Sequence, residues 1–339
     1  MHISYRTRHA LKVTGIVLLV LAAVGLIIYI GWFRWIERYV VYTRDQGAVL
    51  NMELKPLTET GKLAEKPQRK PVRIQYREAG DEEQTGTELT QMIGYYADME
   101  LLADMELVKK QVDLLEPGTA VMLDVKDSKG RFFYSSKLSY DRRASIDPVA
   151  MDDLIRDLKE RDMYLIAKLP ALRDYAFGLS ATDNGLFVSS GAYLWADSDY
   201  CYWLDPTKQG TINYLMSIVS ELRSLGFDEV VFENFCFPET TDLKFSGDRT
   251  MAINTAAAAL VNSCTDQTFA VSFIAEQTGF VTPGGRSRVY YTDVPANQAE
   301  SVATAAGVAD PAIHVVFLTK VHDTRFNDYS VLRPLDSAG

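Results

Sequence analysis

Seven short apolar runs, rich in β-branched and aromatic residues, alternate with amphipathic stretches in the C-terminal part of the chain. Strands that are apolar along their whole length are buried on both faces, as in parallel sheets covered by helices. The alternation predicts an α/β fold, and a length near about 250 residues favours a (β/α)8 TIM barrel. A doubly wound open sheet is the alternative, but no GxGxxG follows a strand to favour its dinucleotide-binding form. The seven runs are residues 92–97, 120–125, 163–169, 229–235, 269–275, 288–294 and 314–320.

The helices between these runs have recognisable boundaries. Asp147 followed by Pro148 is typical of an N-cap and the first helical position. A second helix is expected to stop at Gly226, and a third to begin near Asp248. Only 19 residues follow Lys320, too few for a full final strand and helix. The sequence therefore leaves open a TIM barrel over residues 91–339 that is incomplete at its C-terminus.

An uncharged run from Val13 to Phe33 lies near the N-terminus. About 20 apolar residues cross the hydrocarbon core of a bilayer as a helix. The run is too long for the apolar region of a signal peptide, and no small-x-small cleavage site follows it. We therefore expect residues 13–33 to be a transmembrane helix in contact with the lipid bilayer, after a cytoplasmic tail of residues 1–12.

Basic residues on the two sides of this run are almost balanced in number. A short basic tail before a first span usually stays in the cytoplasm, which favours a single-pass protein of the cell membrane with an extracellular barrel. Residues 34–90 are predicted to be a juxtamembrane helix followed by a stalk, because their charged, Pro- and Gly-containing composition cannot bury enough surface to fold. The flanking basic residues are Arg6, Arg8 and Lys12 before the run and Arg34, Arg38 and Arg44 after it.

Charge and cysteine content exclude several classes of function. The net charge of −10 argues against nucleic acid as a partner, because its phosphates would be repelled. With four histidines and no CxxC or HExxH motif, the sequence predicts neither a metal site nor a cofactor. The three cysteines are too few for a disulfide scaffold, although a single bond between Cys201 and Cys236 stays open.

Carboxylates recur where the predicted strands end, which is where TIM barrels carry their functional groups. Glu233 is the most informative, because a lone charge inside the apolar run VVFENF is costly unless it is paired or functional. Glycoside hydrolysis uses two carboxyl groups, so Asp124, Asp127 or Glu276 is the predicted catalytic partner of Glu233. A single aspartate at a strand end is more often a helix cap or a solvated group.

Aromatic residues are dense in the segment after the third predicted strand. Sugar rings stack on aromatic planes, so this loop suits a glycan site, although the same rings could instead pack as a lid on the barrel. The segment contains Tyr193, Trp195, Tyr200, Tyr202 and Trp203. With polar groups from the strand ends, the predicted substrate-binding residues are Lys126, Lys168, Trp195, Trp203, Asp205 and Asn234.

Three motifs, in order along the chain, carry a resemblance to a known family. The first is DVKD at 124–127 with Gly130, Tyr134 and Ser136; the second is WLDP at 203–206; and the third is LGFDE at 225–229 followed by FENFCFP at 232–238. This combination resembles a glycoside-hydrolase-like family of bacterial TIM-barrel proteins that has no demonstrated activity, and it covers residues 92–264 well. The resemblance implies a barrel, a bacterial envelope location and a polysaccharide substrate.

The third motif departs from the family pattern at three positions. The family has aspartate, tyrosine and arginine where this chain has Glu233, Asn234 and Cys236. The longer glutamate shifts a carboxylate by about one methylene, in a geometry that tolerates roughly half an ångström. Two functions are therefore expected. One is a membrane-anchored glycoside hydrolase acting on a cell-envelope or extracellular polysaccharide, and the alternative is an inactive barrel that binds glycan or serves as an envelope assembly module.

Overall fold

Eight parallel strands close into a barrel in the C-terminal unit of the protein. The computed structural model describes residues 40–43, 47–50, 88–139, 146–266 and 268–337, and the chain divides into two units, residues 1–82 and 83–339. In the second unit each strand pairs with the next one in chain order, and the last pairs with the first. The strands are β3 (Ile93–Ala97), β4 (Ala120–Asp124), β5 (Tyr164–Pro170), β6 (Glu229–Glu233), β7 (Ala270–Ile274), β8 (Val289–Thr292), β9 (Val315–Leu318) and β10 (Ser330–Pro334).

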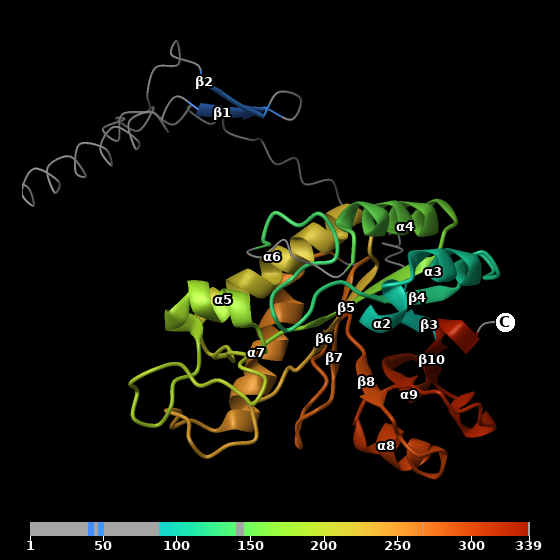
Figure 1. The fold of residues 1–339 in the computed structure, drawn as a ribbon. Coiled ribbons are helices and arrows are strands. Elements are labelled where there is room, and N and C mark those ends of the chain that lie inside the picture. Colours follow the sequence, from blue (N-terminus) through green and yellow to red (C-terminus); the bar gives the residue numbers. More distant parts are fainter. Residues whose placement is uncertain (1–39, 44–46, 51–87, 140–145, 267, 338–339) are drawn as a thin grey trace, which may run out of the picture. The chain divides into compact units, whose positions relative to one another are not determined.

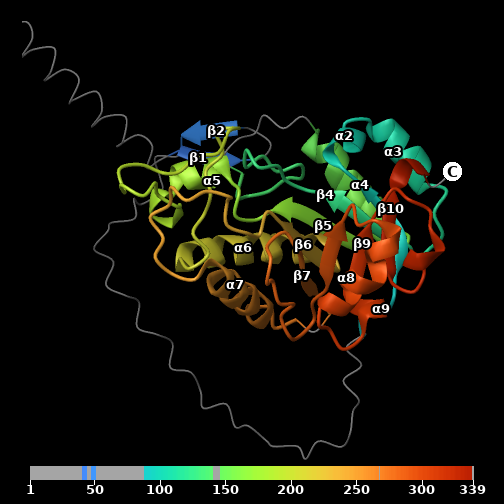
Figure 2. The ribbon, with the colours of Figure 1, turned by 90° about the horizontal axis from the view of Figure 1, so that it is seen from below.

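Helices surround these strands unevenly (Figures 1 and 2). The three longest, α4, α6 and α7, follow β4, β5 and β6, whereas β8 to β10 are connected by short helical turns. The α-helices of this unit are α2 (Met99–Leu102), α3 (Met105–Val112), α4 (Pro148–Glu160), α5 (Tyr175–Ser180), α6 (Gln209–Leu225), α7 (Arg249–Ser263), α8 (Ala299–Ala305) and α9 (Pro311–His314). The 3₁₀ turns are η1 (Thr182–Asn184), η2 (Ala296–Gln298), η3 (Thr324–Phe326) and η4 (Leu335–Ser337).

The predicted helix boundaries are confirmed. The Asp147 carboxylate accepts a hydrogen bond from the backbone of Val149 at the start of α4. Gly226 ends α6 with a φ of 96°, a left-handed conformation that glycine adopts without strain. Asp248 caps α7 by accepting from the backbone of Met251. These local signals succeed because each depends only on residues within one helical turn.

The barrel is complete, so the open expectation of an unfinished C-terminus is wrong. An eighth strand, β10, lies between β9 and β3, with Leu332 opposite both Leu318 and Gly94. The final strand is followed only by the short turn η4 rather than by a full helix. The 19 residues after Lys320 are therefore enough to complete the barrel. Gly94 is required on the other side of β3, because a Cβ there would collide with the carbonyl oxygen of Ala120 in β4.

The N-terminal unit contains a hairpin where the sequence favours a juxtamembrane helix. Strands β1 (Val40–Thr43) and β2 (Gly47–Leu50) pair antiparallel, with Val40 opposite Leu50. Valine, tyrosine and threonine favour extended backbone, and this preference overrides the helical interpretation. The predicted tail, transmembrane helix and most of the stalk lie outside the described residues. Among those that are described, no helix combines the length and apolar composition needed to cross a membrane.

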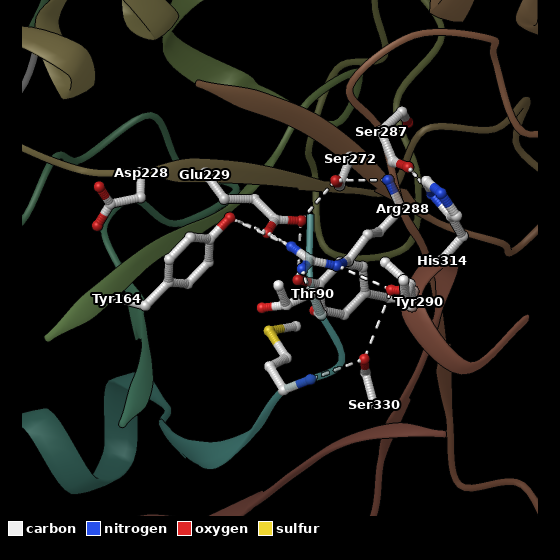
Figure 3. Close-up of polar contacts among 12 residues, drawn as sticks. Thr90, Tyr164, Asp228, Glu229, Ser272, Ser287, Arg288, Tyr290, His314 and Ser330 are labelled. Atoms are coloured by element: carbon white, nitrogen blue, oxygen red, sulfur yellow. Dashed lines mark hydrogen bonds and ion pairs between the residues drawn. The ribbon is translucent and has the colours of Figure 1, made fainter. Parts of the chain in front are cut away.

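A buried polar network joins the strands near their N-terminal ends (Figure 3). The opposite end of the barrel, where the strands finish, is called the mouth. The Arg288 guanidinium donates to the Glu229 carboxylate at 2.5 Å, and both side chains are almost fully enclosed. Ser272, Tyr164 and Tyr290 donate their hydroxyl groups to the same carboxylate. All of these donors are therefore satisfied by one acidic group in the interior of the barrel.

Arg288 also reaches the backbone on both sides of this network. Its Nη2 donates to the carbonyl of Thr90 at 2.8 Å, just before β3. Its Nε donates to the carbonyl of Ile313 at 3.0 Å, just before β9. One guanidinium thus ties together segments from opposite ends of the barrel sequence. A buried charge can be this stable only when its remaining donors are satisfied as they are here.

We predict that Arg288→Met lowers the free energy of unfolding by about 3–5 kcal/mol, because it leaves Glu229 buried without its counter-ion. The matched control is Arg156→Met on α4, whose ion pair with Asp153 is exposed on both sides. That control should leave the free energy of unfolding almost unchanged, because water screens an exposed ion pair. Urea unfolding of the three proteins measures both effects, and equal losses for the two variants would contradict a structural role for the buried pair.

Candidate active site

Four charged side chains lie side by side at the C-terminal ends of β4, β5, β6 and β7. Asp124 ends β4, Lys168 lies near the end of β5, Glu233 ends β6, and Glu276 follows β7. Asp124 and Lys168 are directly opposite each other in the strand register. Because neighbouring parallel strands end at the same edge, the barrel brings together residues that are up to 152 positions apart. We call these four residues the mouth cluster.

Lys168 bridges two of the carboxylates. Its Nζ lies 2.9 Å from Oδ1 of Asp124 and 3.2 Å from Oε2 of Glu233. Since both oxygens contact the same nitrogen, the two carboxylates lie close to each other at the mouth. The side chains of these three residues are between 15 and 29% exposed, so the ion pairs lie partly shielded from water.

Burial and mutual repulsion alter the protonation of the cluster. Burial raises the pKa of Asp124 to about 6, and the negative charge of Glu233 adds to this, while the Lys168 ammonium opposes it. For Lys168 burial alone would lower the pKa, but the carboxylates of Asp124 and Glu233 together raise it. The lysine therefore stays cationic, and the carboxyl groups around it compete for one positive charge.

Glu276 is held by the loop that follows β6. Asn234 has a φ of 49°, a left-handed conformation that turns the chain sharply after Glu233. The side-chain amide of Asn234 donates to Oε1 of Glu276 at 3.5 Å, and the Cys236 thiol lies 3.7 Å from its Oε2.

Despite these donors, Glu276 holds its proton near neutrality. Burial by the surrounding loops and the charge of Glu233 together raise the pKa of Glu276 to about 7, against the hydrogen bond from Cys236. The residue as a whole is exposed at the rim of the mouth, so the carboxyl group is crowded by protein without being closed off from solvent. A carboxylic acid in this state can give a proton to a substrate at neutral pH.

A cavity of about 560 Å³ lies at the rim beside β3 and β10. None of the four residues of the mouth cluster lines it, but Tyr96 does, and Lys168 is close enough to lower the pKa of that phenol, which burial and Asp98 raise more strongly. Asp98 is also the N-cap of α2. Tyr96, which sequence reasoning did not single out, lies near the end of β3 and lines this cavity.

Two of the other predicted site residues are used within the loop after β4. The Lys126 ammonium is buried against Asp174 at 2.9 Å and also donates to the carbonyl of Pro170. Asp127 accepts from the backbone amides of Lys129 and Arg131 and is paired with the Arg131 guanidinium. Both side chains therefore stabilise the loop, which leaves Asp124 as the residue of this motif that belongs to the mouth cluster.

The WLDP motif is enclosed in the same way. Trp203 is 8% exposed and donates its indole N–H to Asp197 at 3.0 Å. Asp205 is 9% exposed and accepts from the amide and hydroxyl of Thr207 in the turn before α6. Trp195 is half-buried against the core. The rings of this loop that reach solvent most fully are Tyr193 and Tyr200.

The disulfide between Cys201 and Cys236 does not form. All three cysteines are free thiols, and they lie in different surroundings. Cys201 is buried beside Ser128, whereas Cys236 contacts Glu276. Burial, with the neighbouring charge of Glu276, raises the pKa of Cys236 to about 12, so this thiol is a weak hydrogen-bond donor rather than a nucleophile. No group of His, Cys, Asp and Glu side chains among the described residues could hold a metal ion.

Comparison with solved structures gives distant matches that share the barrel. A family 36 α-galactosidase from Geobacillus stearothermophilus in complex with stachyose is 12% identical with a TM-score of 0.50, and the match covers 74% of this chain and 39% of that one. A family 20 exo-β-N-acetylglucosaminidase from Vibrio harveyi is 9% identical with a TM-score of 0.46, over 72% and 49% of the two chains. A hypothetical protein from Ruminiclostridium thermocellum is 21% identical with a TM-score of 0.45, over 52% and 96%.

The likeness to the α-galactosidase shows the architecture alone, and the match covers half or less of each of the two glycosidases. No curated protein matches the chain significantly. The sequence profile of a family described as "Putative glycosyl hydrolase domain" matches residues 94–271, from β3 to β7, which includes three of the four residues of the mouth cluster. Because this match spans more than half of the chain, the protein belongs to that glycosyl hydrolase-like family of TIM barrels.

Proposed function

We propose that the barrel is a glycoside hydrolase in which Glu276 is the general acid and Glu233 is the second carboxylate. The feature that supports this most directly is the contrast between the two neighbouring groups. Burial and the charge of Glu233 raise the pKa of Glu276 to about 7, whereas Glu233 itself is ion-paired with Lys168. The cleavage of a glycosidic bond requires one carboxyl group that can donate a proton and a second one beside it.

In this mechanism Glu276 donates its proton to the glycosidic oxygen as the bond to the anomeric carbon breaks. The Glu233 carboxylate either attacks that carbon or removes a proton from the water that does so, which completes the exchange of a sugar–oxygen bond for a hydroxyl group. Lys168 stabilises the negative charge of Glu233 throughout. Asp124 is less suited to be the acid, because it is enclosed between Lys168 and the backbone amide of Met99.

The predicted membrane anchor and family support an extracellular or cell-envelope polysaccharide as the substrate. A tether at residues 13–33 would keep the barrel near its polymer, and the acidic chain is suited to a neutral glycan rather than to an anionic one. The two glycosidases that share the barrel act, by their descriptions, on β-linked N-acetylglucosamine and α-linked galactose, so the fold itself does not select one linkage.

A glycan-binding barrel without turnover is the second candidate. It is favoured by one specific feature, the contact between Lys168 and Glu233, which occupies Oε2 of the carboxylate that should face the substrate. Cys236 also stands where the family pattern has arginine, so a group able to clamp hydroxyl pairs is missing from the mouth. This candidate predicts retention of a glycan with no release of reducing ends.

The catalytic proposal predicts that Glu276→Gln and Glu233→Gln each reduce the rate of glycan cleavage by about 10²–10⁴-fold, because each removes a proton-transferring or charge-stabilising group. Release of reducing sugars from a panel of neutral polysaccharides is the measurement. The control, Glu300→Gln on the exposed side of α8, should keep the wild-type rate. An undiminished rate in Glu233→Gln, with Glu300→Gln also unchanged, would exclude the proposed pair.

The raised pKa of Glu276 also predicts a dependence of stability on pH. Between its ordinary value of 4.5 and about 7 the folded protein holds this proton more tightly than the unfolded chain does. The free energy of unfolding should therefore fall as the pH rises through this window and level off above it.

In Glu276→Gln the fall should be shallower between pH 5 and 7.5, as measured by urea unfolding at both values. Asp124, whose folded pKa is also raised, acts in the same direction up to about pH 6 and remains in both proteins. Parallel curves for wild type and variant would mean that Glu276 does not retain its proton.

A further inference from the structure

A second recessed surface, separate from the mouth cluster, lies on the loop between β5 and α6. Its volume is about 570 Å³, and Asp242 of the loop between β6 and α7 completes its wall. We call it the aromatic groove, because its lining includes Tyr193, Trp195, Tyr200 and Tyr202. None of Asp124, Lys168, Glu233 and Glu276 contributes to it. Figures 1 and 2 both show the two loops side by side at the edge of the barrel near α5.

The scaffold of the groove is rigid. Within the β5–α6 loop Phe187 pairs with Leu194, and Ala196 with Tyr202, in antiparallel bridges. The loop is then fastened to its neighbour, because the amide of Ser189 donates to Asp242 at 3.1 Å. A surface built from several such fixed contacts needs little rearrangement to bind a ligand, which limits the entropy lost on binding.

An ion pair fixes the floor of the groove from below. Asp197 accepts from the Arg173 guanidinium at 2.6 Å and from the indole N–H of Trp203 at 3.0 Å. These contacts, more than offsetting the effect of burial, lower the pKa of Asp197 to about 2. The buried Trp203 thus has a structural role here, since it holds the carboxylate around which the outer rings are arranged.

Two tyrosine rings project outward from this scaffold. Tyr193 is 66% exposed and Tyr200 is 79% exposed. Tyr200 has a φ of 58°, a conformation that is strained for an aromatic residue, and its amide donates to the carbonyl of Asp197. The exposed ring of Tyr200 does not pack in the core, so packing does not explain this strained backbone. Residues with strained backbone conformations are often found at ligand-binding sites.

A third ring is held in a fixed plane beside them. Tyr202 stacks on Tyr175 with the ring centroids 5.5 Å apart and an angle of 10° between the planes. Its own plane is therefore set before any ligand arrives. The rings of Tyr193, Tyr200 and Tyr202 thus form a platform that suits a ligand with flat, weakly polar faces.

The chemistry of the lining indicates which ligand would be bound. Its charged residues are Asp197 and Asp242, and none of the lining residues is basic. Asp242 uses Oδ1 to bind Ser189, and among the described residues its Oδ2 has no hydrogen-bond partner. Aromatic faces bind the C–H faces of sugar rings, and a carboxylate accepts hydrogen bonds from their hydroxyl groups. Anionic polymers would be repelled.

We propose that the aromatic groove is a binding site for a neutral oligosaccharide segment, distinct from the site of cleavage. The site is independent of the proposed reaction, since none of its residues takes part in it. In a glycosidase the groove would hold the polymer near the mouth, and in an inactive barrel it would be the principal glycan site.

The test is affinity electrophoresis of full-length protein through gels that contain laminarin, xyloglucan or galactomannan as neutral polymers, and polygalacturonate as the anionic comparison. All proteins carry Glu276→Gln, so that cleavage does not alter the gel. Migration should be retarded by at least one neutral polymer and not by polygalacturonate. Adding Tyr193→Ala and Tyr200→Ala should raise the apparent Kd on the order of tenfold or more, because two stacking surfaces are lost.

Two matched variants control for exposed apolar surface and for the phenol hydroxyls. Leu114→Ala with Met251→Ala removes comparably exposed side chains elsewhere, and it should leave the retardation unchanged. Tyr193→Phe with Tyr200→Phe keeps the rings and should also bind. Because Tyr193 and Tyr200 lie on the surface, their replacement should leave the unfolding midpoint in place, which urea unfolding checks.

Three results would overturn the proposal: no retardation of the parent protein by any neutral polymer, equal retardation of the alanine variant and its control, or equal binding of polygalacturonate. Failure of the proposed reaction gives a different result. Groove-dependent retardation of the Glu276→Gln protein, together with no cleavage of these polymers by the wild-type protein, supports the binding site while removing the catalytic assignment.

Discussion

The buried pair of Arg288 and Glu229 is the interaction on which the barrel depends most. Removing two charges from water costs several kcal/mol each, and only a fully satisfied network can offset that cost. Here Glu229 accepts from four side chains, and Arg288 donates to carbonyls just before β3 and β9 as well as to Glu229. The starts of six of the eight strands are joined in this way, so the closed sheet has one register rather than several.

That register determines which side chains meet at the mouth of the barrel, where the strands end. Strands that begin together and run in parallel also finish together, so the last residues of β4 to β7 face the same opening. At the base each charge has its partner. At the mouth the carboxylates of Asp124 and Glu233 share one ammonium, that of Lys168, while burial and the charge of Glu233 raise the pKa of the neighbouring Glu276 to about 7. The barrel thus has two charged networks. The one at its base, around Arg288 and Glu229, has a structural role, and the one at its mouth lies beside a carboxyl group whose pKa is near 7.

Much of this arrangement could be predicted from sequence, because it depends on local patterns. Apolar runs locate seven strands, and Asp147, Gly226 and Asp248 mark helix boundaries. The same strand ends predicted Asp124, Lys168, Glu233 and Glu276, which the structure brings together. Strand β10 was missed because it ends in proline, precedes no full helix, and exists through pairing with β3, more than 230 residues earlier in the chain. The hairpin of β1 and β2 was missed because it lies in a segment that was interpreted as a juxtamembrane helix and stalk.

The roles of other residues depend on distant partners that no local pattern reveals. Lys126 looks like a substrate ligand until Asp174 is placed beside it, and Trp203 looks like a sugar platform until Asp197 accepts its indole N–H. Asp124 of the first family motif belongs to the mouth cluster, whereas Lys126 and Asp127 of that motif and the WLDP motif therefore stabilise loops. Their effect on function is indirect, since the same loops hold Tyr193 and Tyr200 outward and frame the aromatic groove.

The most direct test of the central claim, that Glu276 is the acid opposite Glu233, is the pH dependence of kcat/KM for glycan cleavage. Because the acid must be protonated, kcat/KM should fall as the pH rises above about 7, and this basic limb should be absent from the residual activity of Glu276→Gln. A basic limb that persists unchanged in the variant, or wild-type activity that is level through pH 7 to 9, would contradict the assignment.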